Sequence, residues 1–222
     1  MAAEPSSDWP QWRGPLRDNL SSFKGLSTDW AAQPPALLWK VTGLGAGYAS
    51  VSIADGRLYT TGNRDGAQQL IAIDLNSQEV AWTTPLTEKS PSHGYEGSRC
   101  TPTIDGDKAY VVTSNGTIAC VSTADGRIVW QKPFKDWGGR MMSGWGFSES
   151  PLVDGDTVLC TPGSADAMIV CLDKVTGAEI WKSAVPDFGT AGKQGAGYSS
   201  IIISEAAGVK QYVQLVGRGV IG

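Results

Sequence analysis

Two short sequence signals recur along this chain with a period of about 50 residues. The first is a tryptophan at the end of a β-branched stretch, found at Trp39, Trp82, Trp130 and Trp181. The second is the dipeptide Asp-Gly, found at Asp55-Gly56, Asp105-Gly106 and Asp154-Gly155, each about 25 residues before a tryptophan. Periods of 20 to 50 residues are typical of solenoids, propellers and repeat arrays. The chain is therefore predicted to be built from repeated units.

Residues 98–132 show what one unit contains. A short strand pattern, Cys100 to Ile104, leads into Asp105-Gly106, and Asp-Gly is a strong signal for a two-residue hairpin turn. Three further β-rich stretches follow, separated by Asn115-Gly116 and by the turn at 123–126. Each unit is predicted to be a four-stranded antiparallel meander.

Four short strands in a repeat of this length are typical of a propeller blade. The alternatives are a β-sandwich or an irregular β-solenoid, but neither explains one tryptophan for every four strands. The 28 glycines and 9 tryptophans among 222 residues fit repeated turns and repeated docking positions. The predicted fold class is all-β, a β-propeller of four-stranded blades.

The residues before two of the tryptophans resemble a known motif. Cys171-Leu-Asp173-Lys-Val-Thr176-Gly177-Ala-Glu-Ile-Trp181 and Ala72-Ile-Asp74-Leu-Asn-Ser77-Gln78-Glu-Val-Ala-Trp82 are similar to the tryptophan-docking repeat of the quinoprotein, or PQQ-like, propellers. The segment Asp8-Trp-Pro-Gln-Trp-Arg-Gly-Pro15 also looks like the start of exported BamB-like members of this group. The motif is imperfect, because Gln78 replaces a glycine and Ser122 an aspartate.

This resemblance implies structural roles for the motif residues. The tryptophans Trp39, Trp82, Trp130 and Trp181 are expected to pack between blades, and Gly126 and Gly177 to let the neighbouring backbone approach the indole rings.

The repeats divide the chain unevenly. Residues 1–34 are predicted to be an N-terminal extension, 35–41 a lone closing strand that ends in the Trp39 motif, and 35–222 a partial propeller. The predicted blades are 48–83, 98–132, 148–183 and an incomplete one at 198–222. The family usually has seven or eight blades, so the chain resembles the N-terminal half of a larger ring. Alternatively, two copies form a homodimer that completes the ring, each giving its closing strand to the other.

Charge and hydropathy argue against a nucleic-acid partner and against a membrane-spanning segment. The net charge is −4 and no cluster of lysine and arginine is present, so no nucleic-acid partner is expected. The apolar runs are much shorter than the roughly 20 residues of a membrane span.

The four cysteines form no Cys-x-x-Cys pair, and no metal site is predicted. Cys160 and Cys171 lie on paired strands of one hairpin, which leaves open whether they form a disulfide. The family resemblance implies the periplasm or cell envelope, although the chain shows no secretory signal.

Candidate binding residues lie in the long links between blades, because long loops on a rigid scaffold often carry function. The sequences Gly45-Ala-Gly-Tyr-Ala-Ser50 and Gly195-Ala-Gly-Tyr-Ser-Ser200 are nearly identical, and the intermediate copies diverge. The residues expected to line a ligand site at the channel mouth are Tyr48, Arg99, Trp145, Glu149 and Tyr198. The alternative is that the glycines and aromatic residues only let the strands crowd the axis, with Arg99 and Glu149 paired as ions.

The predicted function is a non-catalytic binding or scaffold propeller without a cofactor. A PQQ- and Ca²⁺-dependent alcohol dehydrogenase is an alternative, with Trp145 stacking and Glu149 as a ligand, but the adjacent Cys-Cys pair typical of that branch of the family is absent. A carbohydrate- or peptide-binding propeller is a further alternative. His93 is the only histidine, so a Ser-His hydrolase or multi-histidine metal site has no support within this chain.

Overall fold

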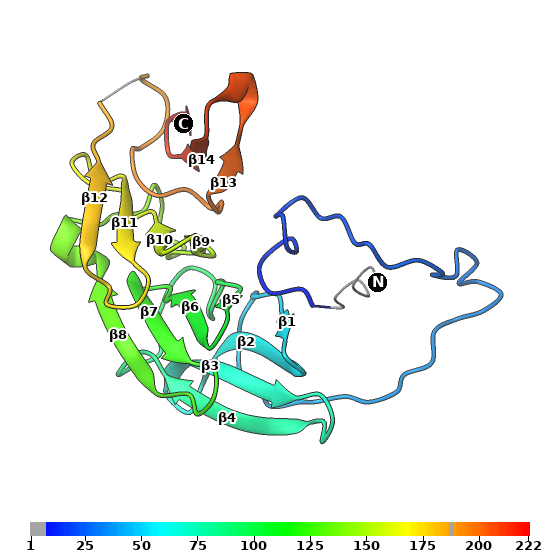
Figure 1. Cartoon of the computed structure of the whole chain (residues 1–222). Helices are drawn as coiled ribbons and strands as arrows, with labels where there is room; N and C mark the ends of the chain where they lie inside the picture. Colours follow the sequence, from blue (N-terminus) through cyan, green and yellow to red (C-terminus); the bar gives the residue numbers. More distant parts are fainter. Residues whose placement is uncertain (1–7, 187–188) are drawn as a thin grey trace.

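A computed structural model describes residues 8–186 and 189–222, which form four antiparallel sheets that fan around one side of the molecule (Figure 1). The strands of the first two sheets are β1 (Ser52–Ala54), β2 (Arg57–Arg64), β3 (Ala67–Asp74), β4 (Glu79–Pro85), β5 (Thr103–Asp105), β6 (Lys108–Val112), β7 (Thr117–Ser122) and β8 (Ile128–Pro133). Those of the last two are β9 (Leu152–Asp154), β10 (Thr157–Cys160), β11 (Ile169–Asp173), β12 (Glu179–Ser183), β13 (Ile202–Ser204), β14 (Gln211–Val216) and β15 (Gly219–Ile221). Two short 3₁₀ helices, η1 (Phe134–Trp137) and η2 (Ala206–Gly208), complete the described elements.

Each sheet is a meander in which consecutive strands pair. The first three sheets have four strands each, and the fourth has β13, β14 and β15. Asp55 and Gly56, which join β1 to β2, both have positive φ, 50° and 73°, as a two-residue hairpin turn of this kind requires. The predicted four-stranded blade is confirmed, and the fold is a partial β-propeller.

The core lies between neighbouring sheets. The middle strands of the second sheet, β6 and β7, are buried almost throughout, because a sheet covers them on each side. Val111, Val112, Ile118 and Ala119 have no exposed surface. Burial on both faces explains why these strands show continuous apolar runs instead of simple alternation.

The docking tryptophans join each blade to the next. The indole Nε1 of Trp82 donates to the carbonyl oxygen of Thr123 at 3.1 Å, and that of Trp130 donates to Lys174 at 3.2 Å. A Cβ built on Gly126 would lie 2.8 Å from the Trp82 ring, so only glycine fits beneath the indole.

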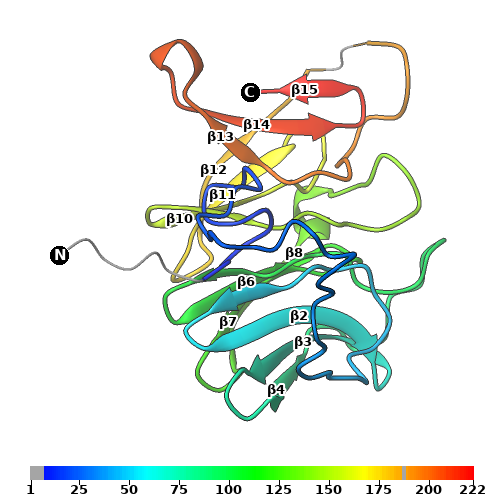
Figure 2. The ribbon, with the colours of Figure 1, turned by 90° about the vertical axis from the view of Figure 1, so that its right-hand side faces the viewer.

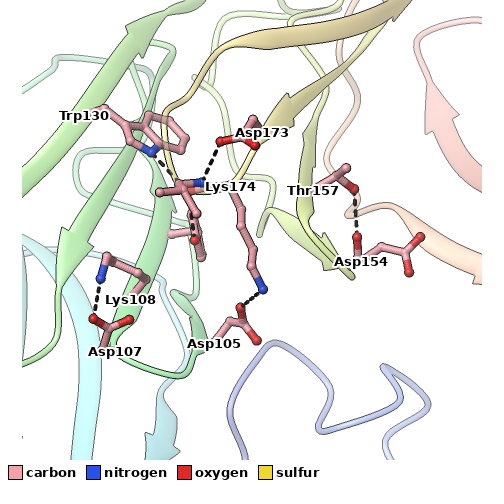
Figure 3. Close-up of polar contacts among 10 residues, drawn as sticks. Asp105, Asp107, Lys108, Trp130, Asp154, Thr157, Asp173 and Lys174 are labelled. Carbon is pink, nitrogen blue, oxygen red and sulfur yellow. Dashed lines mark hydrogen bonds and ion pairs between the residues drawn. The ribbon is translucent and has the colours of Figure 1, made fainter.

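Figure 3 shows the second of these junctions. Besides accepting from Trp130 through its carbonyl oxygen, Lys174 places its Nζ 2.8 Å from the Asp105 carboxylate of the preceding blade. Asp173, the motif aspartate, accepts hydrogen bonds from the backbone of Val175 and Thr176 and so holds the turn that carries Lys174.

The junction between the third and fourth sheets is more open. Trp181 stacks on Tyr212 with ring centroids 6.1 Å apart, yet 37% of Trp181 remains exposed. Lys210 pairs with Asp154, in the manner of the pair between Lys174 and Asp105. The fourth sheet has three described strands, so less surface covers this indole.

Hydroxyl groups join the segments that lead into the inner strands. The backbone N–H of Ser50 donates to Thr101 Oγ1 at 3.2 Å, Thr101 to Ser150 Oγ at 3.2 Å, and Ser150 to Ser200 Oγ at 2.9 Å. We call these four residues the hydroxyl series. Their spacing of 51, 49 and 50 residues is the repeat period itself.

The N-terminal segment contacts the inner ends of the sheets (Figure 2). Trp9 pairs with Ile53 of β1, and the carbonyl oxygen of Pro10 accepts from Ile104 of β5. The predicted extension is therefore partly built into the propeller.

The predicted closing strand at 35–41 pairs with no other strand among the described residues. Leu37 and Leu38 are exposed, and Trp39 is half-buried outside any sheet. An extended segment becomes a strand only where a sheet edge satisfies its N–H and C=O groups, and this segment lies against no sheet edge of the described residues.

The four cysteines are free and buried. Cys160 lies opposite Val170, and Cys171 lies opposite Leu159, so their side chains are one position out of register. Adjacent positions on a strand point to opposite faces, which is why these two thiols form no disulfide.

Candidate functional site

The links between blades meet at one mouth of the partial ring. Two pairs of link residues form isolated parallel bridges there, Gly47 with Ser98 and Met141 with Ala196. At these two bridges, the link that leads into one inner strand lies beside the link that leads into the inner strand of the next blade. Side chains far apart in the sequence become neighbours at this mouth.

Four aromatic rings, three of them exposed and that of Tyr198 partly buried, follow one another around the mouth. The ring centroids of Tyr48 and Tyr95 are 6.5 Å apart, those of Tyr95 and Trp145 5.4 Å, and those of Trp145 and Tyr198 5.4 Å. The first two pairs meet edge to face, at 87° and 85°, a favoured geometry for aromatic pairs. We call these four residues the aromatic arc.

Polar contacts fix the arc in place. The hydroxyl of Tyr198 forms a hydrogen bond with Ser143 Oγ and accepts the backbone N–H of Trp145 at 3.2 Å. The Arg99 guanidinium lies over the Tyr48 ring at 5.5 Å and donates to the carbonyl oxygens of Gly97 and Tyr95. Tyr48 and Trp145 make these contacts although they are 65% and 48% exposed.

The structure thus brings together four of the five predicted site residues, Tyr48, Arg99, Trp145 and Tyr198. Tyr95 was missed as a site residue. A signal for it exists in the sequence, because each member of the arc is the second residue of a Gly-aromatic dipeptide, and Gly94-Tyr95 is one of the four.

The prediction for Glu149 is wrong, because its side chain is buried between the third and fourth blades. Its carboxylate accepts from the backbone N–H and the hydroxyl of Thr161, both at 2.6 Å, and from Gln214 Nε2 at 3.1 Å. Burial raises the pKa of Glu149 to about 7, although these hydrogen bonds and the positive charge of Arg17 lower it. The predicted Arg99–Glu149 ion pair does not form, since Arg99 binds backbone carbonyl groups.

The charge that faces Glu149 comes from the N-terminal segment. Arg17 is only 4% exposed, and its guanidinium donates to the carbonyl oxygens of Ser150, Pro151 and Ile201. Burial lowers the pKa of Arg17 to about 10, an effect that the Glu149 carboxylate opposes. No pattern in the sequence predicts the burial of this arginine.

A family model described as "Outer membrane protein assembly factor BamB", one of the PQQ-like repeat families, matches residues 30–136 and 114–196. The chain belongs to this family. The predicted resemblance to PQQ-like, BamB-like propellers is confirmed.

Individual relatives agree with the family and the fold. The outer membrane protein assembly factor BamB of Burkholderia pseudomallei is 28% identical over 120 residues, which are 51% of this chain and 27% of that protein. A europium-containing methanol dehydrogenase superposes with a TM-score of 0.64 at 16% identity, covering 82% of this chain and 32% of that one. A quinohemoprotein alcohol dehydrogenase from Comamonas testosteroni gives a TM-score of 0.62 at 20% identity, covering 82% and 28%.

The BamB-like chain spans between 27% and 32% of the length of these relatives. The two dehydrogenases, at low identity, show the propeller fold alone.

The carboxylate expected to be a ligand in a PQQ–Ca²⁺ site does not lie at the mouth of this BamB-like chain. A calcium ion needs several oxygen ligands, usually carboxylates, and the carboxylate expected to serve, Glu149, is held by Thr161 and Gln214 inside a blade junction. Among residues 8–186 and 189–222, no group of three or more histidine, cysteine, aspartate or glutamate side chains is placed to hold a metal ion. Trp145 could stack on a flat ligand, but it already packs against Tyr95 and Tyr198.

In the part of the chain that the structure describes, no helix is long and apolar enough to cross a membrane.

Proposed function

We propose that this BamB-like chain is a non-catalytic binding propeller of the bacterial cell envelope that holds a protein partner at the aromatic arc. The run of four contacting rings at one mouth, three of them exposed, carries the proposal. Contiguous exposed apolar surface marks interaction sites, and tyrosine and tryptophan are enriched at the centres of protein interfaces.

The state of the rings supports a role in binding. Each ring already contacts a neighbouring ring, and Tyr198 is held by Ser143 and Trp145, so little side-chain entropy remains to be lost when a partner docks. The envelope location and the protein partner are supported by membership of a family described as an outer membrane protein assembly factor.

A photo-crosslinking experiment tests the proposal. Benzoylphenylalanine replaces Tyr95 in the arc or Trp30 in the N-terminal segment, an exposed tryptophan outside the arc. We expect a specific protein adduct in the envelope from position 95, weakened at least fivefold by Trp145→Ala, and no such adduct from position 30. Identical adducts from both positions, or none from position 95, would contradict the proposal.

Two further measurements distinguish the alternatives. Addition of PQQ and Ca²⁺ is expected to give neither cofactor absorbance nor dye-linked alcohol oxidation, and activity here would establish the dehydrogenase alternative instead. Tryptophan fluorescence titrated with maltoheptaose tests carbohydrate binding, because sugars stack on exposed indole rings. A saturable change that Trp145→Ala abolishes would replace the protein partner with a carbohydrate.

A further inference from the structure

The chemistry of the aromatic arc indicates what kind of protein segment it can hold, an inference that rests on the function proposed above. Three of its rings are open to solvent, since Tyr48, Tyr95 and Trp145 are 65%, 55% and 48% exposed. The fourth, Tyr198, is partly buried, and its hydroxyl is engaged by Ser143 and by the backbone of Trp145. A partner therefore meets the first three rings.

Each of these three side chains carries a polar hydrogen that the protein leaves unused. The indole Nε1–H groups of Trp82, Trp130 and Trp137 all donate to acceptors within the chain. Among residues 8–186 and 189–222, by contrast, the Nε1–H of Trp145 and the hydroxyls of the two exposed tyrosines have no hydrogen-bond partner. A ligand that places acceptors next to apolar surface would satisfy all three groups.

Gly94 leaves the nitrogen edge of the Trp145 indole uncrowded. A Cβ built on Gly94 would lie 3.2 Å from Trp145 Cδ1 and 3.5 Å from Nε1, so any larger residue would press against this edge. The φ of Gly94 is not positive, so the backbone does not require glycine at this position. The missing side chain thus leaves room beside the indole N–H.

The arc itself is uncharged. Arg99, the cation that lies over Tyr48, already donates to the carbonyl oxygens of Gly97 and Tyr95. Its position is therefore set by contacts within the protein. What the arc offers a partner is ring surface together with O–H and N–H donors, which favours a neutral ligand rich in acceptors.

The contacts between the rings shape this surface. Tyr48 meets Tyr95 at 87° and Tyr95 meets Trp145 at 85°, so each pair presents a corner between the face of one ring and the edge of the other. The centroids are 6.5 Å and 5.4 Å apart, and polyproline II rises about 3.1 Å per residue, so the three rings lie along about four residues of such a helix. Surfaces lined by aromatic rings are a recurring mode of binding proline-rich segments.

We propose that the aromatic arc binds a proline-rich segment of its partner in the polyproline II conformation. Proline has no N–H, so a run of prolines offers backbone carbonyl acceptors alone, which complement the three unused donors. Its flat rings supply apolar surface for the corners between the aromatic rings. Polyproline II forms before binding, which lowers the entropic cost of docking.

The test uses the full chain labelled with ¹⁵N and two neutral peptides of equal length, N-acetyl-octaproline amide and N-acetyl-(Gly-Ser)₄ amide. The indole N–H signal of Trp145 is identified by its loss in Trp145→Phe. We expect octaproline to move this signal downfield in a saturable manner, because Nε1–H gains an acceptor, and the Gly-Ser peptide to bind at least about tenfold more weakly. Equal binding of the two peptides, or no shift with octaproline, would overturn the proposal.

Conservative variants test the individual contacts. Tyr48→Phe and Tyr95→Phe keep the rings but remove the unused hydroxyls, and each is expected to weaken octaproline binding about threefold. Gly94→Ala should weaken it about fivefold by crowding the edge of Trp145 that carries the donor. Gly144→Ala is the matched control, because this glycine also precedes an arc residue, its φ is not positive, and a Cβ there meets nothing within 4 Å. Equal binding by both glycine variants would show that the indole N–H takes no part.

Crosslinking separates failure of this proposal from failure of the proposed function. We expect octaproline to reduce the envelope adduct formed by benzoylphenylalanine at position 95. An adduct that octaproline leaves unchanged, with no octaproline shift, would overturn the proline-rich ligand and leave the protein partner in place. A saturable octaproline shift without any adduct would support the ligand class and contradict the proposed partner. A response of the Trp145 signal to maltoheptaose but not to octaproline would replace both with a carbohydrate.

Discussion

The guanidinium of Arg17 donates to the carbonyl oxygen of Ile201 at 2.8 Å, a contact between the segment before the first blade and the start of the fourth. The same group also donates to Thr103, Ser150 and Pro151, so one side chain links inner segments of three blades to the N-terminal segment. These hydrogen bonds of the buried guanidinium hold the N-terminal segment against sheets that are far from it in the sequence.

Loss of this side chain is expected to destabilise the whole partial ring. Arg17→Met leaves buried carbonyl groups without donors, and we expect the free energy of unfolding to fall by about 3 kcal/mol. Urea unfolding followed by circular dichroism measures the change. Lys24→Met, in the same segment but exposed, should change stability by less than about 0.5 kcal/mol. Equal stability of the two variants would show that the Arg17 contacts contribute little.

The buried carboxyl of Glu149 predicts a pH dependence of unusual sign. Its pKa in the folded protein is about 7, above the ordinary value of 4.5 for a glutamate, so the folded state binds more protons than the unfolded state between these values. Stability should therefore be greatest below pH 4.5 with respect to this group and fall as pH rises to 7. At about 1.4 kcal/mol per pKa unit, the decrease is about 3 kcal/mol.

Glu149→Gln provides the comparison, because it keeps nearly the same shape but cannot ionise. Its amide replaces one accepting carboxylate oxygen with an NH₂ donor, so the comparison uses the change of stability with pH and not the absolute stability. Urea unfolding of both proteins at pH 5 and pH 7.5 should show a larger loss of stability in the parent protein. The difference between the two profiles removes contributions from other titrating groups. Parallel profiles would mean that Glu149 titrates near its ordinary pKa.

The docking glycines predict steric effects that can be separated from backbone strain. Gly177 has φ of +70°, and a Cβ there would lie 2.7 Å from the Trp130 ring. Gly177→Ala combines strain with overpacking, and we expect a loss of about 3 kcal/mol. Gly155→Ala is the matched control, since φ is +58° in the same blade and nothing lies within 4 Å, so only about 1 kcal/mol of strain is expected. A similar loss in both variants would argue against close docking of the indole.

The free thiols should be unreactive in the folded protein. Burial raises the pKa of Cys100 to about 12 and that of Cys120 to about 11, and the thiolate is the reactive form. Titration with DTNB should detect almost no thiol under native conditions and all four in denaturant. Detection of only two thiols in denaturant without reductant would indicate a disulfide.

Local signals predicted most of the fold. The Asp-Gly turns, the β-branched stretches and the tryptophan motif each depend on neighbouring residues, and they predicted a propeller of four-stranded blades. In the structure, the indoles of Trp82 and Trp130 each bond to the next blade. The closing strand at 35–41 depends on a distant edge that local patterns do not contain. Its pairing with another copy remains a prediction, which light scattering can test.

The site was predicted less completely for a similar reason. Tyr48, Trp145 and Tyr198 were recognisable because the Gly-aromatic sequence repeats. Glu149 was misplaced because its environment is set by Thr161 and Gln214, and the latter comes from another blade. The role of Arg17 depends on residues more than 80 positions away, and no periodic signal marks it.

The hydroxyl series has a consequence for how such a protein can evolve. Every link in it runs the same way, from the N–H of one blade to the hydroxyl of the next, so each unit brings one donor and one acceptor. Duplication of a gene segment that encodes one unit would add both together. The number of blades can thus change during evolution while every inner junction keeps its hydrogen bond.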